Sequence, residues 1–330
     1  MPNWSDILSE INGTRQNALV AAQGAADLIR RKHLTELHQL SGVPGQQRNI
    51  IAYYSGFLSK PGIQGIDIND EDKNGFMMAV HNLDPKYGLD LILHTPGGNM
   101  AATESLVSYL KQKFGNDIRA IIPQIAMSGG TMIACSCKEI IMGRQSNLGP
   151  VDPQLGGIPA AGVMQEFKKA YAEIKRDKNR VQVWQFILRQ YPPSFLGQCE
   201  NAFDRAANFV RKELEANMFR DLPKAKRERT ARKVVKALTD FSGNKGHDRH
   251  IHYDELKAMG LKVTQLEESQ TFQDLVLTVH HCYMHSLMNT NAFKIIENHM
   301  GVAFVKMQQS FQMTGIPGMI PPMIVPQPGS

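Results

Sequence analysis

The sequence predicts an α/β fold built around a mostly parallel β-sheet. Short apolar, β-branched segments alternate with helical segments over much of the 330 residues, and strands joined by helical crossovers have this pattern. Two of the apolar segments run directly into glycine-rich turns, which lets the chain change direction as it leaves the sheet. A hydrophobic content of 42% is that of a globular protein.

The segment before the first strand predicts an N-terminal helical arm over residues 1–45. Apolar residues recur mostly three and four positions apart between Ile7 and Leu40, the spacing of one helix face. The cluster Ser41–Gly45 contains glycine and proline, which end a helix. We expect this arm to pack on the core or on a neighbouring subunit.

A core over residues 46–265 is predicted to hold the alternating strands and helices. Strands are expected at Asn49–Gly56, Leu89–His94, Arg119–Ile125 and Glu139–Met142. Helices are expected at Lys73–Leu83, which Asn69–Asp72 can cap, and in the apolar stretch Met132–Ser136. A short helix, Asp254–Met259, is expected near the end of the core.

Within this core, residues from about 164 to 238 predict a helical insertion that covers the functional site or projects as an arm. Met164–Lys178 is expected to continue through Val181–Leu188 until Tyr191-Pro192-Pro193 stops it. A second long helix is expected at Gln198–Leu222.

The C-terminal part predicts two helices over residues 266–312 and a flexible tail over residues 313–330. The helices are expected at Gln265–Met288 and Asn291–Gln309, where the spacing of apolar residues suits packing or oligomerisation. The tail is rich in proline and glycine, which disfavour regular structure.

The net charge of +6 is modest, but much of the excess falls in Lys224–Lys236. Clustered Lys and Arg side chains bind phosphates in nucleic-acid-binding proteins. Here Val234, Val235 and Leu238 have helical spacing and no aromatic residues interleave with the charges. This pattern favours the solvated face of an amphipathic helix, so we expect no nucleic-acid partner.

Several classes of protein are disfavoured by the remaining features. No apolar stretch is long enough to span a bilayer, and the N-terminus lacks the basic and apolar regions of a secretory signal. Neither a metal-binding spacing nor a disulfide framework is formed by the cysteines, which are Cys135, Cys137, Cys199 and Cys282. We therefore expect a cytoplasmic protein without a membrane segment, a metal or a cofactor.

The two glycine-rich turns are the candidate functional site. The strand Leu89–His94 runs into Thr95-Pro96-Gly97-Gly98, and the strand Arg119–Ile125 runs into Ala126-Met127-Ser128-Gly129-Gly130. Ser128 would then lie at a helix N-terminus, where backbone N–H groups favour negative charge. A nucleophilic serine needs a base and donors for the developing oxyanion, and these glycines can supply the donors. An ordinary turn and a serine helix cap are alternatives that the spacing leaves open.

Taken together, the motifs resemble those of the ClpP-class serine peptidases of the crotonase superfamily. The resemblance rests on His94–Gly98, Ala126–Gly130 and Ser146–Pro150, and it covers Asn49 to Thr264. The turn Leu148–Gln154 makes the chain most similar to the serine dehydrogenase proteinase family. The resemblance implies a ClpP/crotonase-like core of repeated ββα units and hydrolysis of peptide bonds. It also implies Ser128 as nucleophile and an oxyanion hole formed by the amides of Gly98 and Gly129.

The resemblance leaves the base open. ClpP relatives have a histidine at about the interval of Asp152, and an aspartate near the position of His247 and Asp248. An exchange of the two would make the triad Ser128, Asp152 and His247. A simple exchange at fixed backbone would instead place Asp152 beside the hydroxyl. The alternatives are therefore Asp248 as the acid, and His250 or His252 as the base.

A Ser-Lys dyad is a further alternative, in which burial would lower the pKa of Lys168 or Lys169. Two other classes of function also remain: a crotonase-like acyl-CoA enzyme and a catalytically inactive scaffold. The loops lack an obvious glutamate pair, which argues against the acyl-CoA enzyme. For a peptidase we expect a peptide or unfolded protein as substrate, a homo-oligomer, and a partner protein or ATPase.

Overall fold

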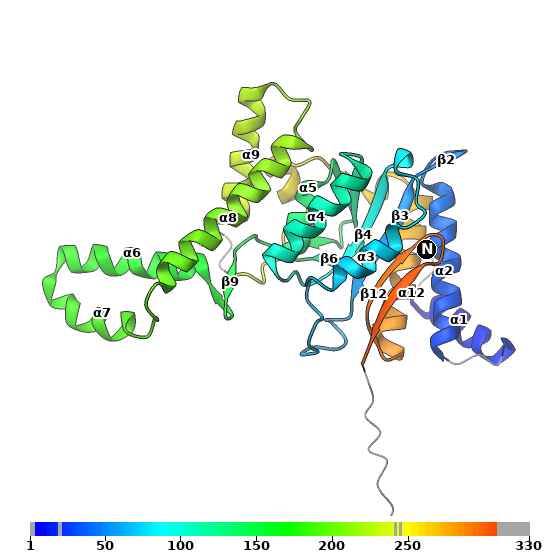
Figure 1. Ribbon diagram of the computed structural model, residues 1–330, viewed down its shortest axis with the longest axis horizontal. Helices are drawn as coiled ribbons and strands as arrows, with labels where there is room; N and C mark the ends of the chain where they lie inside the picture. The colour runs from blue at the N-terminus through cyan, green and yellow to red at the C-terminus, as the bar shows by residue number, and fades with distance from the viewer. Residues whose placement is uncertain (1–3, 19–21, 241–242, 244–245, 309–330) are drawn as a thin grey trace, which may run out of the picture.

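A computed structural model describes residues 4–18, 22–240, 243 and 246–308 of the protein, and its centre is a seven-stranded sheet (Figure 1). The strand order is β11-β7-β5-β4-β3-β12-β13. The strands from β11 to β3 are parallel, whereas β12 and β13 run antiparallel to their neighbours. The prediction of an α/β fold with a mostly parallel sheet is confirmed. The bounds are β3 (Asn49–Ser55), β4 (Leu89–His94), β5 (Ile118–Ile122), β7 (Glu139–Met142), β11 (Val263–Gln265), β12 (Ala292–Asn298) and β13 (Ala303–Met307).

Helices cover both faces of the sheet, because alternate residues along each buried strand point to opposite sides. In the register of the sheet Ile92 pairs with Ala52 and Ile121, and all three pack on the face covered by α2 (Ala22–Leu40) and α12 (Gln270–Asn289). Leu91 and Leu93 point to the other face. The helices on that face are α3 (Asp72–Val80), α4 (Met100–Phe114), α5 (Gly129–Ser136), α8 (Phe195–Ala216), α9 (Lys224–Leu238) and α11 (Tyr253–Met259).

The N-terminal segment contains two helices, α1 (Trp4–Ala18) and α2 (Ala22–Leu40). Residues 19–21 between them lie outside the described residues. Leu34 and Leu37 of α2 are fully buried against the sheet, beside α12 (Gln270–Asn289). The helix α2 therefore completes one face of the core.

The predicted strand Arg119–Ile125 is interrupted at Pro123, which has no N–H group for a sheet hydrogen bond. Strand β5 ends at Ile122, and the next two-residue strand, β6 (Ile125–Ala126), pairs instead with β8 (Asn147–Leu148). This interruption carries the chain out of the central sheet and toward Ser128.

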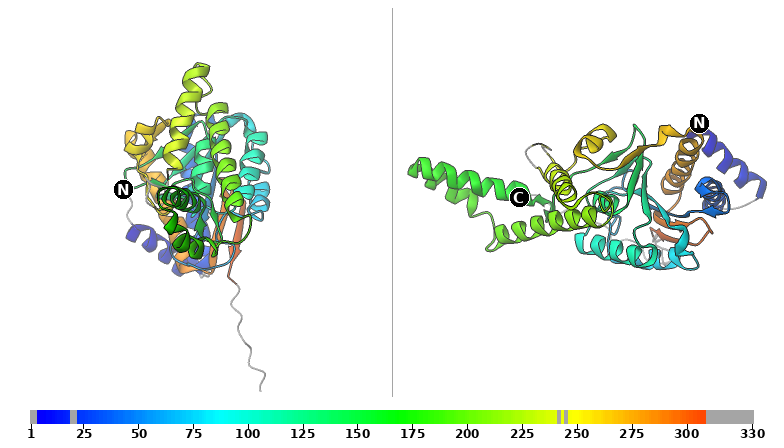
Figure 2. Two further views of the ribbon diagram at one scale, coloured as in Figure 1. Left: turned by 90° about the vertical axis from the view of Figure 1, so that its left-hand side faces the viewer. Right: turned by 90° about the horizontal axis from the view of Figure 1, so that it is seen from above.

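The predicted continuous helix from Met164 to Leu188 was wrong, because the chain reverses direction. Helix α6 (Ala160–Arg176) ends at a short 3₁₀ turn, Lys178–Arg180, and α7 (Val181–Leu188) runs back along it. The Asp177 side chain accepts from the Asn179 amide at 3.0 Å and stabilises this turn. The α6–α7 hairpin projects from the body of the molecule (Figures 1 and 2), whereas α8 returns to pack on α5.

The predicted second C-terminal helix, Asn291–Gln309, was also wrong: this segment forms the strands β12 and β13. The Asn298 side chain accepts from the amides of Met300 and Val302 at 2.9 and 3.1 Å, and Gly301 has a φ of 82° in the tight turn. Strand β12 is buried along its whole length, so its apolar residues show no clean alternation. The predicted tail, residues 313–330, lies outside the described residues.

The short elements of the chain lie around this core. They are β1 (Gly42–Val43), β2 (Gln46–Gln47), β9 (Gln154–Leu155), β10 (Ile158–Pro159) and the 3₁₀ turns Pro85–Tyr87 and Leu266–Glu268.

None of the helices in the described ranges combines the length and the apolar character that crossing a bilayer requires.

Candidate active site

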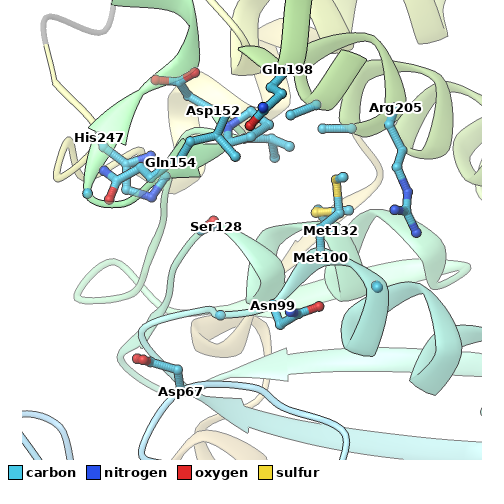
Figure 3. A pocket seen from close by; sticks show the side chains of 18 of the residues that line it. Asp67, Asn99, Met100, Ser128, Met132, Asp152, Gln154, Gln198, Arg205 and His247 are labelled. Atoms are coloured by element: carbon cyan, nitrogen blue, oxygen red, sulfur yellow. The ribbon is translucent and has the colours of Figure 1, made fainter. Parts of the chain in front are cut away.

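Ser128 lies between β6 and α5, at the edge of the sheet where the parallel strands end. Its φ and ψ are 47° and −107°, a conformation that costs a non-glycine residue about 1–3 kcal/mol. The Ser128 side chain makes no capping hydrogen bond to α5. The predicted alternative of an ordinary serine cap therefore does not describe Ser128. Figure 3 shows its hydroxyl oxygen directed into a cavity.

The turn Thr95–Gly98 is attached to the segment that carries Ser128. The Met127 amide donates to the Thr95 carbonyl at 3.0 Å, and the Thr95 amide donates to the Ile125 carbonyl at 3.2 Å. Gly97 and Gly98 have φ values of 94° and 155°, which glycine adopts without a side-chain clash. A Cβ atom on Gly97 would lie 2.8 Å from the Ser128 Cβ atom, so the two turns are in close contact.

Two backbone amides beside Ser128 are free. Among the described residues, the N–H groups of Gly98 and Gly129 donate no hydrogen bond. They are close together, because a Cβ atom on Gly129 would lie 3.4 Å from the Gly98 nitrogen. Gly129 is also the first residue of α5, where the helix dipole favours negative charge. Two free amides in this position are suited to an oxyanion.

A segment distant in the sequence holds the glycine turn from its other side. Ile68 forms an isolated parallel bridge with Gly98. Its amide donates to the Gly97 carbonyl at 2.8 Å, and its carbonyl accepts from the Asn99 amide at 2.8 Å. These two bonds leave the intervening Gly98 amide unpaired. The Ile68 segment was not recognised as part of the site in the sequence, because no local pattern reveals an isolated bridge.

Ser128 and Gly98 line a cavity of about 840 Å³ whose walls come from six regions of the chain (Figure 3). Apolar side chains from α4 and α5, Met100 and Met132, form one wall. The polar residues of the cavity that the sequence analysis missed are Asp67, Asn99, Gln154, Gln198, Asn201 and Arg205. Three of them lie on α8, so the predicted helical insertion contributes both a wall of the site and a projecting hairpin.

His247 lines the same cavity as Ser128, although the two are far apart in the sequence. Its side chain is partly buried, and its Nδ1 atom has no partner among the described residues. Burial lowers the pKa of His247 below 6.5, and the charge of Asp248 opposes this shift. The imidazole is therefore neutral near pH 7 and able to accept a proton. Among the described residues, no hydrogen bond joins His247 to Ser128.

Asp152 also lines the cavity, but its carboxylate is engaged elsewhere. The Ala161 amide at the start of α6 donates to its Oδ1 atom at 3.3 Å, and in Figure 3 the carboxylate points away from Ser128. The Oδ2 atom is buried and has no partner among the described residues. Burial raises the pKa of Asp152, and the hydrogen bond from Ala161 opposes this.

Thr131 ties the loop of Asp152 to the helix of Ser128. Its hydroxyl donates to the Gly149 carbonyl at 2.9 Å and accepts from the Gly149 amide at 3.1 Å. All of these groups are buried. The Leu-Gly-Pro turn is thereby held against α5.

The other predicted acid and base residues are not brought to the cavity. Lys168 and Lys169 are exposed on α6 in the projecting hairpin, and neither lines the cavity. Asp248 and His250 are exposed and likewise do not line it. The arrangement therefore gathers Ser128, Gly98, Asp152 and His247 around one space.

The chain is similar to a known protein family and to uncharacterized relatives. A family model described as ClpP-like SDH-type serine proteinase matches residues 47–296. An uncharacterized protein of Methanocaldococcus jannaschii is 33% identical over 196 residues, which are 59% of this chain and 60% of the relative. A second uncharacterized protein of that organism is 31% identical over 207 residues, 63% of this chain and 62% of the relative. The chain thus spans about three fifths of the length of these curated relatives.

Proposed function

Because this chain belongs to the ClpP-like SDH-type serine proteinase family, we propose that it hydrolyses peptide bonds through an acyl-enzyme on Ser128. The observation that carries the proposal is the placement of the Ser128 hydroxyl. It faces a cavity from a positive-φ turn, beside the free amides of Gly98 and Gly129. In this position the oxygen can attack a carbonyl carbon while the two amides bind the oxyanion that forms.

His247 is the proposed general base. It takes the Ser128 proton during attack and returns it to the leaving amine when the peptide bond breaks. A water then attacks the acyl-enzyme with His247 again as base, and the second oxyanion occupies the same two amides. Support comes from the shared cavity and from the lowered pKa of the imidazole, which keeps it neutral. Closure of the site around a substrate would complete the Ser128–His247 hydrogen bond, which is often long in unliganded sites.

Asp152 is the proposed acid that orients His247. Its unpaired Oδ2 atom lies in the wall of the same cavity, whereas Asp248 is exposed outside it. For this role the Asp152 carboxylate must turn from the Ala161 amide toward the imidazole. There it would fix the tautomer and stabilise the imidazolium.

The shape of the site favours an extended polypeptide as substrate. A second cavity of about 710 Å³ lies beside the first and shares Asp67, Gly98, Asn99 and Gln154 with it. The two cavities adjoin at the oxyanion turn, and a peptide or an unfolded protein long enough to enter both would cross that turn. Assembly of several copies is also part of the proposal, since the α6–α7 hairpin exposes Tyr171 and Phe186 to solvent.

The proposed peptidase is distinguished from an acyl-CoA enzyme by the residues around Ser128. Glutamates supply the acid and base groups of the acyl-CoA alternative, and among the described residues none lines the cavity of Ser128; Glu71 lines only the adjoining cavity. A scaffold without activity would have no need of a strained serine beside two free amides.

A fluorophosphonate probe tests this function, because it reacts with an activated serine. We expect the wild type to be labelled and Ser128→Ala to be unlabelled, with the label located on Ser128 by mass spectrometry. Ser108→Ala, an exposed serine on α4, is the matched control and should keep the label. A folded wild-type protein that resists the probe would remove the peptidase hypothesis.

A further inference from the structure

A buried ion pair lies behind the oxyanion turn, outside the cavity. Lys294 on β12 and Asp72 at the start of α3 are 2.7 Å apart, with side chains 0% and 1% exposed. The ammonium group donates to both carboxylate oxygens of Asp72 and to the Asp67 carbonyl, so all its hydrogens have acceptors. A buried pair of this kind adds little net stability, because desolvation offsets the attraction. Its contacts indicate another role.

The first set of contacts reaches Ile68 on both sides. Lys294 donates to the Asp67 carbonyl at 2.7 Å, and the Asp72 carboxylate accepts from the Asn69 amide at 3.1 Å. Ile68 lies between these two anchored residues and hydrogen-bonds to the backbone on either side of Gly98. The ion pair therefore fixes the strand segment against which the Gly98 amide is aligned.

The second set of contacts reaches the same turn through β3. The Tyr53 hydroxyl donates to the Asp72 carboxylate at 2.8 Å, and the Thr95 side chain is near enough to this hydroxyl to lower its pKa, against the larger effect of burial. The Thr95 hydroxyl in turn accepts from the Gly97 amide at 3.2 Å. The buried carboxylate is thus linked to one side of the turn through Asn69 and Ile68, and through Tyr53 it is anchored beside Thr95 on the other side.

We propose that Lys294, Asp72 and Tyr53 are positioning residues that set the orientation of the Gly98 amide for oxyanion binding. The inference rests on the proposed function for its catalytic consequence. Oxyanion donors must be held within about 0.5 Å of the productive geometry, and a turn of two glycines has no side chains to hold it. The hydrogen-bonded frame around it supplies that rigidity.

Tyr53→Phe is the sharpest test, because it removes one hydroxyl and leaves the ion pair intact. The matched control is Tyr54→Phe, the next residue on β3. Tyr54 is equally buried, but its hydroxyl bonds His280 on the opposite face of the sheet at 3.3 Å. We expect Tyr53→Phe to lower kcat and the rate of fluorophosphonate labelling by about tenfold, with KM changed by less than about twofold. Tyr54→Phe should react like the wild type.

Hydrogen–deuterium exchange measures the same positioning without catalysis. The amides of Ile68 and Asn99 are both hydrogen-bonded in the bridge, so their exchange reports its opening. We expect faster exchange over residues 66–69 and 97–99 in Tyr53→Phe, and wild-type exchange in Tyr54→Phe. The double variant Lys294→Met with Asp72→Asn removes the ion pair without leaving an unpaired buried charge, and it should show the larger increase.

The outcomes separate this inference from the proposed function. If the wild type is not labelled by the fluorophosphonate probe, the proposed peptidase activity is wrong. The role of the three positioning residues is then tested by hydrogen–deuterium exchange alone. Wild-type exchange in Tyr53→Phe overturns the inference whether or not the protein is labelled. If the wild type is labelled, equal kcat and labelling rates in Tyr53→Phe and Tyr54→Phe also overturn it.

Discussion

Gly97 packs on Ser128 so closely that a methyl group on Gly97 would lie 2.8 Å from the Ser128 Cβ atom. The same methyl group would lie 2.7 Å from the Met127 carbonyl oxygen and 2.9 Å from the Gly129 nitrogen. Because these neighbours are mostly backbone, they can move aside only if the serine turn moves. The alignment of the serine and its amides therefore depends on a glycine at this position.

Gly97→Ala is expected to lower kcat/KM by at least about tenfold and the free energy of unfolding by about 1–3 kcal/mol. The methyl group adds a clash to the strain of a φ of 94°. Gly115→Ala is the control, because Gly115 also has a positive φ, 62°, but none of the described residues comes within 4 Å of its Cβ position. That variant should lose about 1–2 kcal/mol and keep its activity. Urea unfolding measures the stability of the two variants, and peptide turnover measures their activity. Equal losses of activity in Gly97→Ala and Gly115→Ala would contradict the prediction.

His247→Gln is expected to lower kcat by about 10²-fold or more, because the glutamine amide cannot accept the serine proton. Lys168→Ala and Lys169→Ala should retain wild-type turnover, since both lysines are exposed on α6 away from the cavity. Steady-state kinetics on a fluorogenic peptide compare the variants. Turnover by His247→Gln at the wild-type rate would remove this histidine from the mechanism.

The pH dependence of kcat/KM should follow the protonation of His247. The neutral imidazole is the active form, so activity is lost as pH falls through the pKa of the folded protein. Burial holds that pKa below 6.5, which places the acid limb of the profile below pH 6.5 and leaves activity level at neutral pH. A midpoint above pH 7 would show that a different group is the base.

His94→Phe is expected to make the protein less sensitive to acid. His94 is fully buried at the end of β4, both of its ring nitrogens lack partners among the described residues, and burial lowers its pKa to about 3. Below pH 6.5 the His94 imidazole binds a proton in the unfolded chain but not in the folded one. The free energy of unfolding therefore decreases as the pH is lowered from 6.5 to about 3. Phenylalanine keeps an aromatic ring beside Tyr54 and Phe57, and it removes the pH-dependent loss of stability that His94 causes.

Urea unfolding at several pH values between 7 and 4 measures the effect. The slope should fall by up to about 1.4 kcal/mol per pH unit in His94→Phe. Part of the slope should remain, because burial also lowers the pKa of the neighbouring His280. His81→Gln, which changes an exposed histidine, is the control and should keep the wild-type slope. A slope unchanged in His94→Phe would contradict the prediction.

Thr131→Val is expected to cost about 1–3 kcal/mol of stability, because the buried Gly149 amide loses its acceptor. Activity should fall as well, since the loop of Asp152 is no longer tied to the helix of Ser128. Thr230→Val on α9 is the control; among the described residues, the Thr230 hydroxyl bonds only to the Lys226 carbonyl in its own helix. Thermal unfolding and peptide turnover compare the two variants. If Thr131→Val were as stable and as active as Thr230→Val, the Thr131–Gly149 hydrogen bonds would have no role in holding the loop.

Where local pattern decides the structure, the sequence predicted it well. Leu89–His94 is a strand over the predicted residues, because a mostly apolar run leads into a turn that ends in two glycines. Ser128 lies directly before a helix, as predicted from the glycines and the apolar stretch that follow it. The same local reading was wrong at Asn291–Gln309. Its apolar spacing suits a helix, and only the free edge of β3 makes the first half of it a strand.

The sequence by itself determined the alternation of strands and helices between Asn49 and Met142 and the two glycine turns, since these depend on neighbours along the chain. Only the tertiary structure decided which distant groups meet there. Ile68 aligns the Gly98 amide, Lys294 and Asp72 hold Ile68, and His247 joins the cavity of Ser128. Each of these contacts joins segments that are brought together by the burial of apolar faces. The hydrophobic effect is not directional, so the local sequence does not indicate which distant segments will meet.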